Sequence, residues 1–301
     1  MAALHGILNL NKPAGWTSHD VVARVRRILG QRRAGHAGTL DPLATGVLLV
    51  GVGQGTRVLE YLMKGQKVYR AVARLGIVTN TYDIQGQIIA TAEVPDLTRT
   101  ELETALRPFC GEIQQTPPAY SAVKQQGEPA YRRARRGAEL QLTPRLVTIE
   151  RIELQAWQPP LLTLEVHCSP GTYIRSLIHD LGQALGCGAT LVELTRLRSG
   201  HFTLEEAISL ETLAAAATKG DLDRYLHPLQ AALADLLPVH VTAEEIACLV
   251  HGQAIPCPYH PPAATGYALA PDGAVVAILA YSARTGQWLP HKVLWPTANH
   301  P

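Results

Sequence analysis

The chain has 301 residues, of which 47% are hydrophobic and 17% charged, and its formal net charge at pH 7 is only +2. This composition is typical of a globular protein with one large domain, or with a large and a small one, and excludes disordered and fibrous classes. No apolar run approaches the roughly 18–20 residues that span a bilayer, and the N-terminus lacks the pattern of a signal peptide, so we expect no membrane association.

The five cysteines are scattered along the chain, and no two of them form a CxxC pair. This spacing disfavours both a zinc site and a disulfide framework. Unpaired thiols are typical of a reducing compartment, so the sequence predicts a cytoplasmic protein.

Positive charge is concentrated in two segments although the whole chain is nearly neutral. Residues 12–36 hold six Lys or Arg against one acid, and residues 124–136 hold five against one. Such imbalance indicates a surface that binds a polyanion such as RNA. It is equally compatible with two solvated faces, and charge alone does not decide between them.

The first predicted helix covers residues 17–30, where apolar side chains recur every three or four positions. Thr17 and Asp20 form a capping-box pair at its start, and Gly30 fits its end. Residues 66–92 then predict a strand, a turn and a second strand.

Further elements follow as a helix, a hairpin and two helices. We expect a helix over 98–110, two antiparallel strands over 145–157 and 161–169, a helix over 173–186 and another over 203–218, which begins with a Thr–Glu capping box. The strands and helices do not alternate as βαβ units. The sequence therefore predicts an α+β domain with a mixed, mostly antiparallel sheet and flanking helices.

The pattern changes near Pro238, where short strands and one helix replace the longer elements. A capped helix ends at Gly252, a hairpin turns at the sequence PDG, and residues 287–295 form a last strand. We expect a small β-barrel there, with domains at 1–237 and 238–301.

Asp41 is the one carboxylate in the stretch GHAGTLDPLATGVL, residues 35–48. Asp followed by Pro is a favoured start of a helix, so Asp41 is one candidate helix cap. The neighbouring His36, Thr39 and glycines instead favour a functional loop. The stretch alone leaves both interpretations open.

Five segments, in order, resemble the bacterial tRNA pseudouridine-55 synthases of the TruB family. They are NKPAGWTSHDVV, RAGHAGTLDPLATGVL, KVYRAVARLG, PPAYSAVK and CSPGTYIRSLIHDLGQALGCGA. The resemblance implies a pseudouridine synthase fold with a C-terminal PUA-like RNA-binding domain. It also implies isomerisation of uridine 55 in the T loop of tRNA to pseudouridine, by base flipping and without a metal or cofactor.

The resemblance also assigns roles to individual residues. Asp41, Tyr69 and Arg175 match the catalytic aspartate, the tyrosine that stacks on the target base and the arginine that pairs with the aspartate. The substrate-binding positions are His36, which occupies the space of the flipped base, with Tyr69, Tyr173 and Leu194. The RNA-binding positions are Lys12, a motif lysine near the catalytic loop for which a structural role is the alternative, and a group in a basic RNA-clamping insertion at about 116–145. That group is Lys124, Arg132, Arg133, Arg135 and Arg136.

One segment departs from the family pattern, because Asn80 stands where an acid is usual, while Asp83 is retained. Two rival hypotheses remain beside a stand-alone monomeric enzyme that acts on the tRNA T stem-loop without a protein partner. One is a non-catalytic RNA-binding or RNA-chaperone protein. The other is a related enzyme guided by a separate RNA and accessory proteins, which the basic insertion disfavours.

Overall fold

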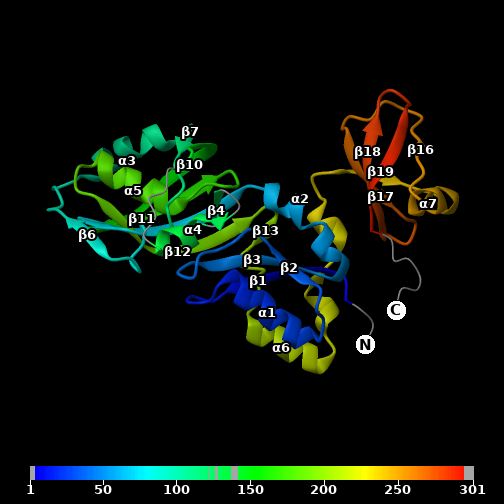
Figure 1. Ribbon diagram of the computed structural model, residues 1–301, viewed down its shortest axis with the longest axis horizontal. Helices are drawn as coiled ribbons and strands as arrows, with labels where there is room; N and C mark the ends of the chain where they lie inside the picture. The colour runs from blue at the N-terminus through cyan, green and yellow to red at the C-terminus, as the bar shows by residue number, and fades with distance from the viewer. Residues whose placement is uncertain (1–3, 122, 126–127, 137–141, 295–301) are drawn as a thin grey trace.

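The computed structural model describes residues 4–121, 123–125, 128–136 and 142–294. Its larger sheet has the strand order β14-β1-β3-β12-β4-β11-β10-β7, with β2 added to β3 and β13 to β12 (Figure 1). The strands are β1 (Gly6–Lys12), β2 (Ala34–Ala37), β3 (Thr45–Val52), β4 (Lys67–Leu75), β7 (Gly111–Gln115), β10 (Arg145–Gln158), β11 (Leu161–Cys168), β12 (Ala189–Ser199), β13 (Phe202–Thr203) and β14 (Leu226–His227). The β3–β12 pair is parallel and the other pairs are antiparallel, which confirms the predicted mixed sheet.

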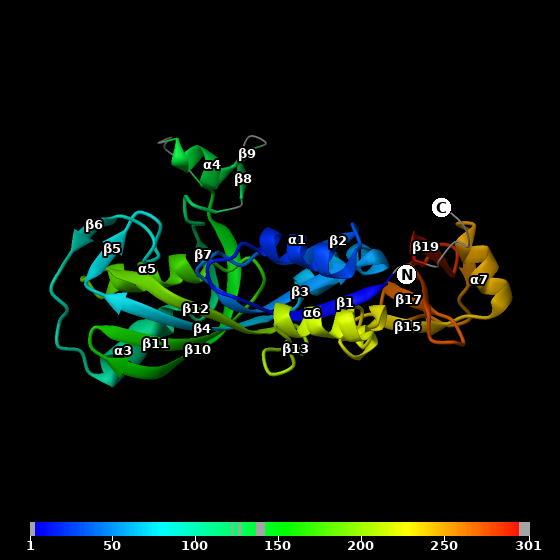
Figure 2. The same ribbon diagram turned by 90° about the horizontal axis from the view of Figure 1, so that it is seen from below.

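Two amphipathic helices cover one side of this sheet, and α3 (Arg99–Leu106) lies on the other (Figure 2). They are α1 (Ser18–Leu29) and α5 (Ile174–Ala184), whose apolar stripes belong to one buried cluster with the sheet. Helix α1 begins and ends as predicted, with a complete capping box at Thr17 and a left-handed Gly30. The helix α2 (Leu59–Lys64) and the hairpin of β5 (Ile77–Thr79) and β6 (Ile88–Thr91) complete this part.

The helix predicted over 203–218 is shorter than expected. Helix α6 (Leu210–Lys219) begins after Ser209, whose side chain caps it. Ile208 instead pairs with the first strand, since its N–H donates to Asn9 O at 3.0 Å and its carbonyl accepts from Asn11 N at 2.9 Å. The residues just before it form a turn, in which the N–H of Ala207 donates to Leu204 O at 3.1 Å, so the long-range pairing of Ile208 overrides the helical pattern of this segment.

The C-terminal residues form a second, five-stranded sheet that curls as half of a barrel, with α7 (Ala243–Val250) beside it (Figure 1). Its order is β15 (Leu237–His240), β17 (Thr265–Leu269), β18 (Val275–Ser282), β19 (Gln287–Val293) and β16 (Ile255–Pro256). This matches the expected PUA-like architecture. The domain boundary at 237 stays a prediction.

Contacts join the C-terminal sheet to the larger one. A buried cluster includes Val47 and Leu49 of β3 together with Tyr267 and Ile278 of the C-terminal sheet. The Nζ atom of Lys292 also donates to Arg57 O at 3.0 Å. Within the described ranges, no helix is both long and apolar enough to cross a membrane.

Candidate active site

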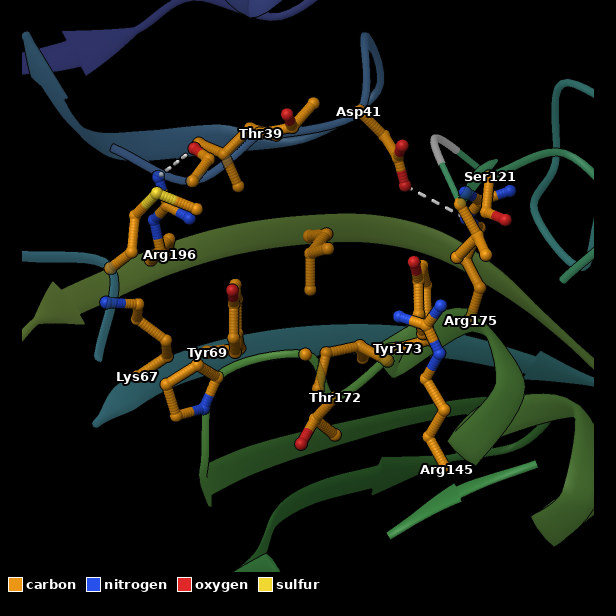
Figure 3. A pocket seen from close by; sticks show the side chains of 18 residues that line it. Thr39, Asp41, Lys67, Tyr69, Ser121, Arg145, Thr172, Tyr173, Arg175 and Arg196 are labelled. Carbon is orange, nitrogen blue, oxygen red and sulfur yellow. Dashed lines mark hydrogen bonds and ion pairs between the residues drawn. The ribbon is translucent and has the colours of Figure 1, made fainter. Parts of the chain in front are cut away.

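A pocket of about 350 Å³ opens over the centre of the larger sheet. Its walls come from the loop at residues 38–41, strands β4 and β12, and the loop that leads into α5. Figure 3 shows Asp41 on one wall, with Arg175 directed toward it and Tyr69 beneath them on the sheet. The fold therefore gathers three residues that the sequence analysis had singled out from distant segments.

Asp41 stands on a tight turn and does not cap a helix. The N–H of Ala44 donates to the carbonyl of Asp41 at 3.0 Å, and β3 starts at the next residue, Thr45. Gly46 has a φ of 95°, and a Cβ there would approach the carbonyl of Arg196 to 2.3 Å. Only glycine therefore lets β3 lie against β12, a contact that holds the Asp41 turn over the pocket.

Arg175 is the buried cation of the site, with 5% of its side chain exposed. Its Nε lies 2.9 Å from Oδ2 of Asp41, and its Nη1 lies 3.6 Å from Oδ2 of Asp83. The same guanidinium donates to the carbonyls of Thr81, at 3.1 Å, and Tyr120, at 2.9 Å. Because contacts on several sides fix the guanidinium, it presents a preorganised charge to the Asp41 carboxylate.

Two opposing effects act on the Asp41 carboxylate. Burial in the pocket raises its pKa above the usual value, and the positive charge of Arg175 acts in the opposite direction. The side chain still exposes 39% of its surface toward the pocket opening. A ligand that closed this opening would remove more water from the carboxylate. The ionised form of Asp41 would then depend more strongly on the charge of Arg175.

The pocket floor is the face of β4 and β12 that carries Tyr69 and Leu194. Both side chains are buried, and Arg196 pairs with Tyr69 in the β4–β12 register. Tyr173 stands at the opposite wall, immediately before α5, where the Gln115 side chain bonds both its N–H, at 2.7 Å, and its carbonyl, at 3.1 Å. These side chains give the pocket an apolar and aromatic surface that suits a flat ring.

His36 lies beside the pocket, on β2, one residue before the strand ends and two before the pocket residue Gly38. Its ring meets that of His19 edge to face at 5.3 Å, and its Nδ1 is buried without a hydrogen-bond partner. Burial is the main cause that lowers its pKa to about 4, and the charges of His19 and Arg196 lower it further. The ring is therefore neutral at physiological pH.

Lys12 occupies a different environment from the RNA-binding one that we expected. Its side chain is fully buried, and Nζ donates to the carbonyls of Pro13, Trp16 and Pro42 at 2.9, 2.6 and 3.4 Å. Since each of its hydrogens is directed to protein oxygen, Lys12 ties two loops together behind Asp41. With no exposed surface it does not present its charge to a phosphate, so its burial contradicts the predicted RNA contact and supports the structural role.

The basic insertion begins at the pocket and projects from the same side of the sheet as α1 and α5 (Figure 2). Its described elements are β8 (Lys124–Gln125), β9 (Glu128–Pro129) and α4 (Ala130–Arg135). Arg132 and Arg136 are exposed, Arg133 is half-buried, and Arg136 pairs with Glu128. Residues 122, 126–127 and 137–141 of the predicted segment lie outside the described ranges. The RNA-binding role of the five basic residues of the insertion stays a prediction: Lys124, Arg132, Arg133, Arg135 and Arg136.

Two buried cations in the pocket were missed by the sequence analysis. Lys67 donates to Leu62 O at 3.1 Å, and burial is the main cause that lowers its pKa to about 8. Arg196 donates to Val47 O at 2.6 Å and to Gly38 O at 3.3 Å. Lys67 lies two residues before Tyr69 on β4, and Arg196 lies two residues after Leu194 on β12, so each shares a strand face with a predicted site residue. This spacing is the sequence signal that could have indicated their place in the pocket.

Asn80, the departure from the family pattern, closes a loop and does not line the pocket. Its Oδ1 accepts from the N–H of Gln87 at 2.9 Å. Asp83 of the same loop is buried, accepts from Thr81 Oγ1 at 2.7 Å and contacts Arg175. Asp83, the acid of the family pattern that this chain retains, is therefore the residue of this loop that contacts the site.

Comparison with known proteins identifies the family. Residues 26–174 match the family model described as TruB family pseudouridylate synthase (N terminal domain), and residues 175–234 match the tRNA pseudouridylate synthase B C-terminal domain. A curated tRNA pseudouridine synthase B from Gloeobacter violaceus is 48% identical over 257 residues, which cover 84% of this chain and 87% of the relative. The chain belongs to the TruB family.

Other members and neighbours agree with this assignment to the TruB family. The tRNA pseudouridine synthase B of Syntrophotalea carbinolica is 46% identical, over 83% of this chain and 81% of that protein. A solved H/ACA RNP bound to a substrate RNA containing 2'-deoxyuridine contains a chain that is 27% identical, with a TM-score of 0.75 over 97% of this chain and 85% of that one. The resemblance found in five sequence segments is thereby confirmed, and so is the expected pseudouridine synthase fold.

Proposed function

We propose that this TruB-family chain is a tRNA pseudouridine synthase that isomerises uridine 55 of the T loop. In this reaction the bond between N1 of uracil and C1' of ribose breaks, the base turns, and C5 bonds to C1'. C5 releases its hydrogen as a proton and N1 takes up a proton, so the product is an isomer of the substrate. The observation that carries the proposal is the Asp41 carboxylate, held 2.9 Å from a buried Arg175 in a pocket lined by Tyr69.

The pocket residues have complementary roles in this proposal. Asp41 is the reacting carboxylate, which acts on the flipped nucleotide as a nucleophile or as a base. Arg175 keeps it oriented and favours its ionised form. Tyr69 stacks on the uracil ring, and Tyr173 and Leu194 confine it.

A uridine within the folded T loop must leave its stack before it can enter the pocket, which costs a few kcal/mol. The neutral ring of His36, beside the pocket opening, fills the space that the base leaves and offsets part of this loss. The arginines of the insertion hold the phosphates around the loop, and such contacts provide affinity and salt dependence.

We further propose that the chain works as a monomer, without a guide RNA or an obligatory protein partner. The high identity to proteins named tRNA pseudouridine synthase B supports this, as does the chain's own basic insertion. The reaction takes place in the cytoplasm and requires no metal or cofactor. All five cysteines lie within the described ranges and are unpaired, as is common in a reducing compartment.

The test is incubation of the purified chain with an unmodified tRNA transcript, followed by carbodiimide mapping of pseudouridine. We expect one modified position, 55, with the same rate in the presence of EDTA. The matched controls are Asp41→Asn, which should bind the transcript without modifying it, and a transcript with cytidine at position 55. Equal modification by Asp41→Asn would contradict the mechanism, and modification only after addition of a second protein or RNA would support the guided alternative.

A further inference from the structure

The outward face of α1 carries a charged surface that the pocket does not use. Two adjoining hollows run along this helix, and they share Ala23 and Arg27 in their linings. Trp16, with 39% of its surface exposed, and Arg24 line the first hollow, and Arg32 lines the second. We call the surface formed by Trp16, Arg24, Arg27 and Arg32 the α1 groove.

The arginines of the α1 groove are not engaged in ion pairs with neighbouring acids. Among the described residues, no carboxylate lies within 4.0 Å of Arg24, Arg27 or Arg32. Asp20 borders the groove, but its carboxylate accepts from the N–H and the hydroxyl of Thr17 at 2.9 and 2.6 Å. Glu211 of α6 is near enough to interact with Arg24 but forms no ion pair with it.

The Trp16 end of the groove is fastened to the catalytic loop. Gly15 N–H donates to Pro42 O at 2.8 Å. The buried Lys12 Nζ bonds the carbonyls of both Trp16 and Pro42. The groove therefore starts one loop away from Asp41 and leads from it along α1, on the same side of the sheet as the insertion (Figure 2).

We propose that the α1 groove binds the phosphate backbone of the RNA stem that adjoins the loop whose nucleotide enters the Asp41 pocket. The inference rests on the proposed function, and it adds a second RNA contact to the one proposed for the insertion. Guanidinium groups suit phosphates because their N–H donors match two phosphate oxygens at once.

The arrangement of the groove fits a continuous strand better than a single anion. Arg24 and Arg27 lie one helical turn apart, with about 5–6 Å between their Cβ atoms, and Arg32 extends the row beyond the helix end at Leu29. Trp16 adds an aromatic face at the end nearest the pocket, where the stem meets unpaired bases that can stack on it. The stem is then held between α1 and the insertion while its loop faces Asp41.

The test is steady-state kinetics of the triple variant Arg24→Gln, Arg27→Gln, Arg32→Gln on a T stem-loop RNA at several salt concentrations. We expect KM to rise about 10-fold or more with kcat unchanged, and the slope of log KM against log salt to fall by about 2 to 3, one for each lost phosphate contact. Trp16→Ala should raise KM by about 3- to 10-fold with no change in that slope. Arg26 is left intact because its Nη2 donates to Ala34 O.

Two control variants make the outcome specific. The triple lysine variant of the same positions keeps the charges and should keep the salt slope. Neutralising three exposed arginines on other elements should change neither KM nor slope; these are Arg74, Arg107 and Arg284. Equal unfolding temperatures of the triple glutamine variant and the wild type would exclude misfolding. If the triple variant is unstable, the single variants Arg27→Gln and Arg32→Gln are measured in its place.

An unchanged KM and salt slope in the triple glutamine variant would overturn the proposal and make the groove a solvated face. The proposed function fails in a different way, because the wild type would then form no pseudouridine. RNA binding measured by filter retention would in that case still report the contribution of the groove.

Discussion

Arg175 Nε lies 2.9 Å from Asp41 Oδ2, and this pair joins the turn before β3 to the first turn of α5. The same guanidinium contacts Asp83 and two backbone carbonyls, so its position does not depend on Asp41 alone. The carboxylate is thus presented to the pocket by a cation that is already fixed. This is the property expected of a site whose charges are arranged before the substrate arrives.

A double-mutant cycle tests whether the two residues act as one unit. We expect Asp41→Asn and Arg175→Met each to reduce the single-turnover rate of pseudouridine formation by about 10³-fold or more, and the double variant to be little worse than either, since residues that act together are not additive. Tritium release from C5 of labelled uridine measures the rate. Additive losses would mean that Arg175 serves another step.

A pH titration of stability tests the environment of His36. Its pKa is about 4 in the folded protein, against 6.5 in the unfolded chain, so the unfolded state binds the extra proton between these values. The corresponding stability is present above pH 6.5 and is lost as the pH falls toward 4. Relative to His36→Gln, the wild type should therefore lose about 1–3 kcal/mol of unfolding free energy over this range.

Urea unfolding at pH 7, 5.5 and 4.5 would measure this difference. A second neutral replacement, His36→Asn, controls for effects of side-chain size and should give the same pH dependence. A difference between wild type and variant that does not change with pH would mean that the ring takes up its proton without penalty in the folded protein.

Elements whose ends are set by their own residues could be predicted from the sequence. Helix α1 is one example, because Thr17, Asp20 and Gly30 satisfy its terminal backbone groups locally. The structure of the segment before α6 could not be predicted in this way, because Ile208 pairs with the distant strand β1. The period of apolar residues indicates only the local preference for a helix, and the hydrogen bonds between Ile208 and β1 outweigh that preference in this segment.

The candidate site shows the same division. Asp41, Tyr69 and Arg175 were singled out by their resemblance to family motifs, and the fold brings them to one pocket. Lys67 and Arg196 were not: their spacing of two from Tyr69 and Leu194 places them on the pocket face, but their burial there depends on how β4 and β12 pack in the fold. The burial of Lys12 was missed for the same reason, since its partners are carbonyls of folded loops.

Lys12→Met tests the role of Lys12 in joining the two loops. The variant should lose stability, because the Pro13 and Trp16 carbonyls lose their Nζ partner, at about 1–3 kcal/mol for unsatisfied buried groups. Burial lowers the Lys12 pKa to about 8 from 10.5, so the unfolded state binds the extra proton between these values. The advantage of wild type over variant should therefore grow as the pH rises from 8 to 10.5.

Chemical unfolding at pH 7.5, 9 and 10 measures both effects of this substitution. Lys67 titrates in the same range but is present in both proteins, so its contribution cancels in the difference. An equal stability of the two proteins at every pH would show that the Lys12 hydrogen bonds do not hold the loops.

Charge reversal in the insertion tests whether it holds RNA. Four arginines are changed to glutamate in one variant: Arg132, Arg133, Arg135 and Arg136. Binding of a T stem-loop should weaken at least 10-fold, and its salt dependence should flatten, because fewer counterions are released when fewer phosphates are contacted. Fluorescence anisotropy at 50 to 200 mM salt measures both quantities.

Reversal of Arg107 and Arg284, which are exposed on other elements, is the control and should leave the slope unchanged. An unaltered slope in the insertion variant would instead mean that its arginines are solvated and that phosphates are held on another surface, such as the α1 groove.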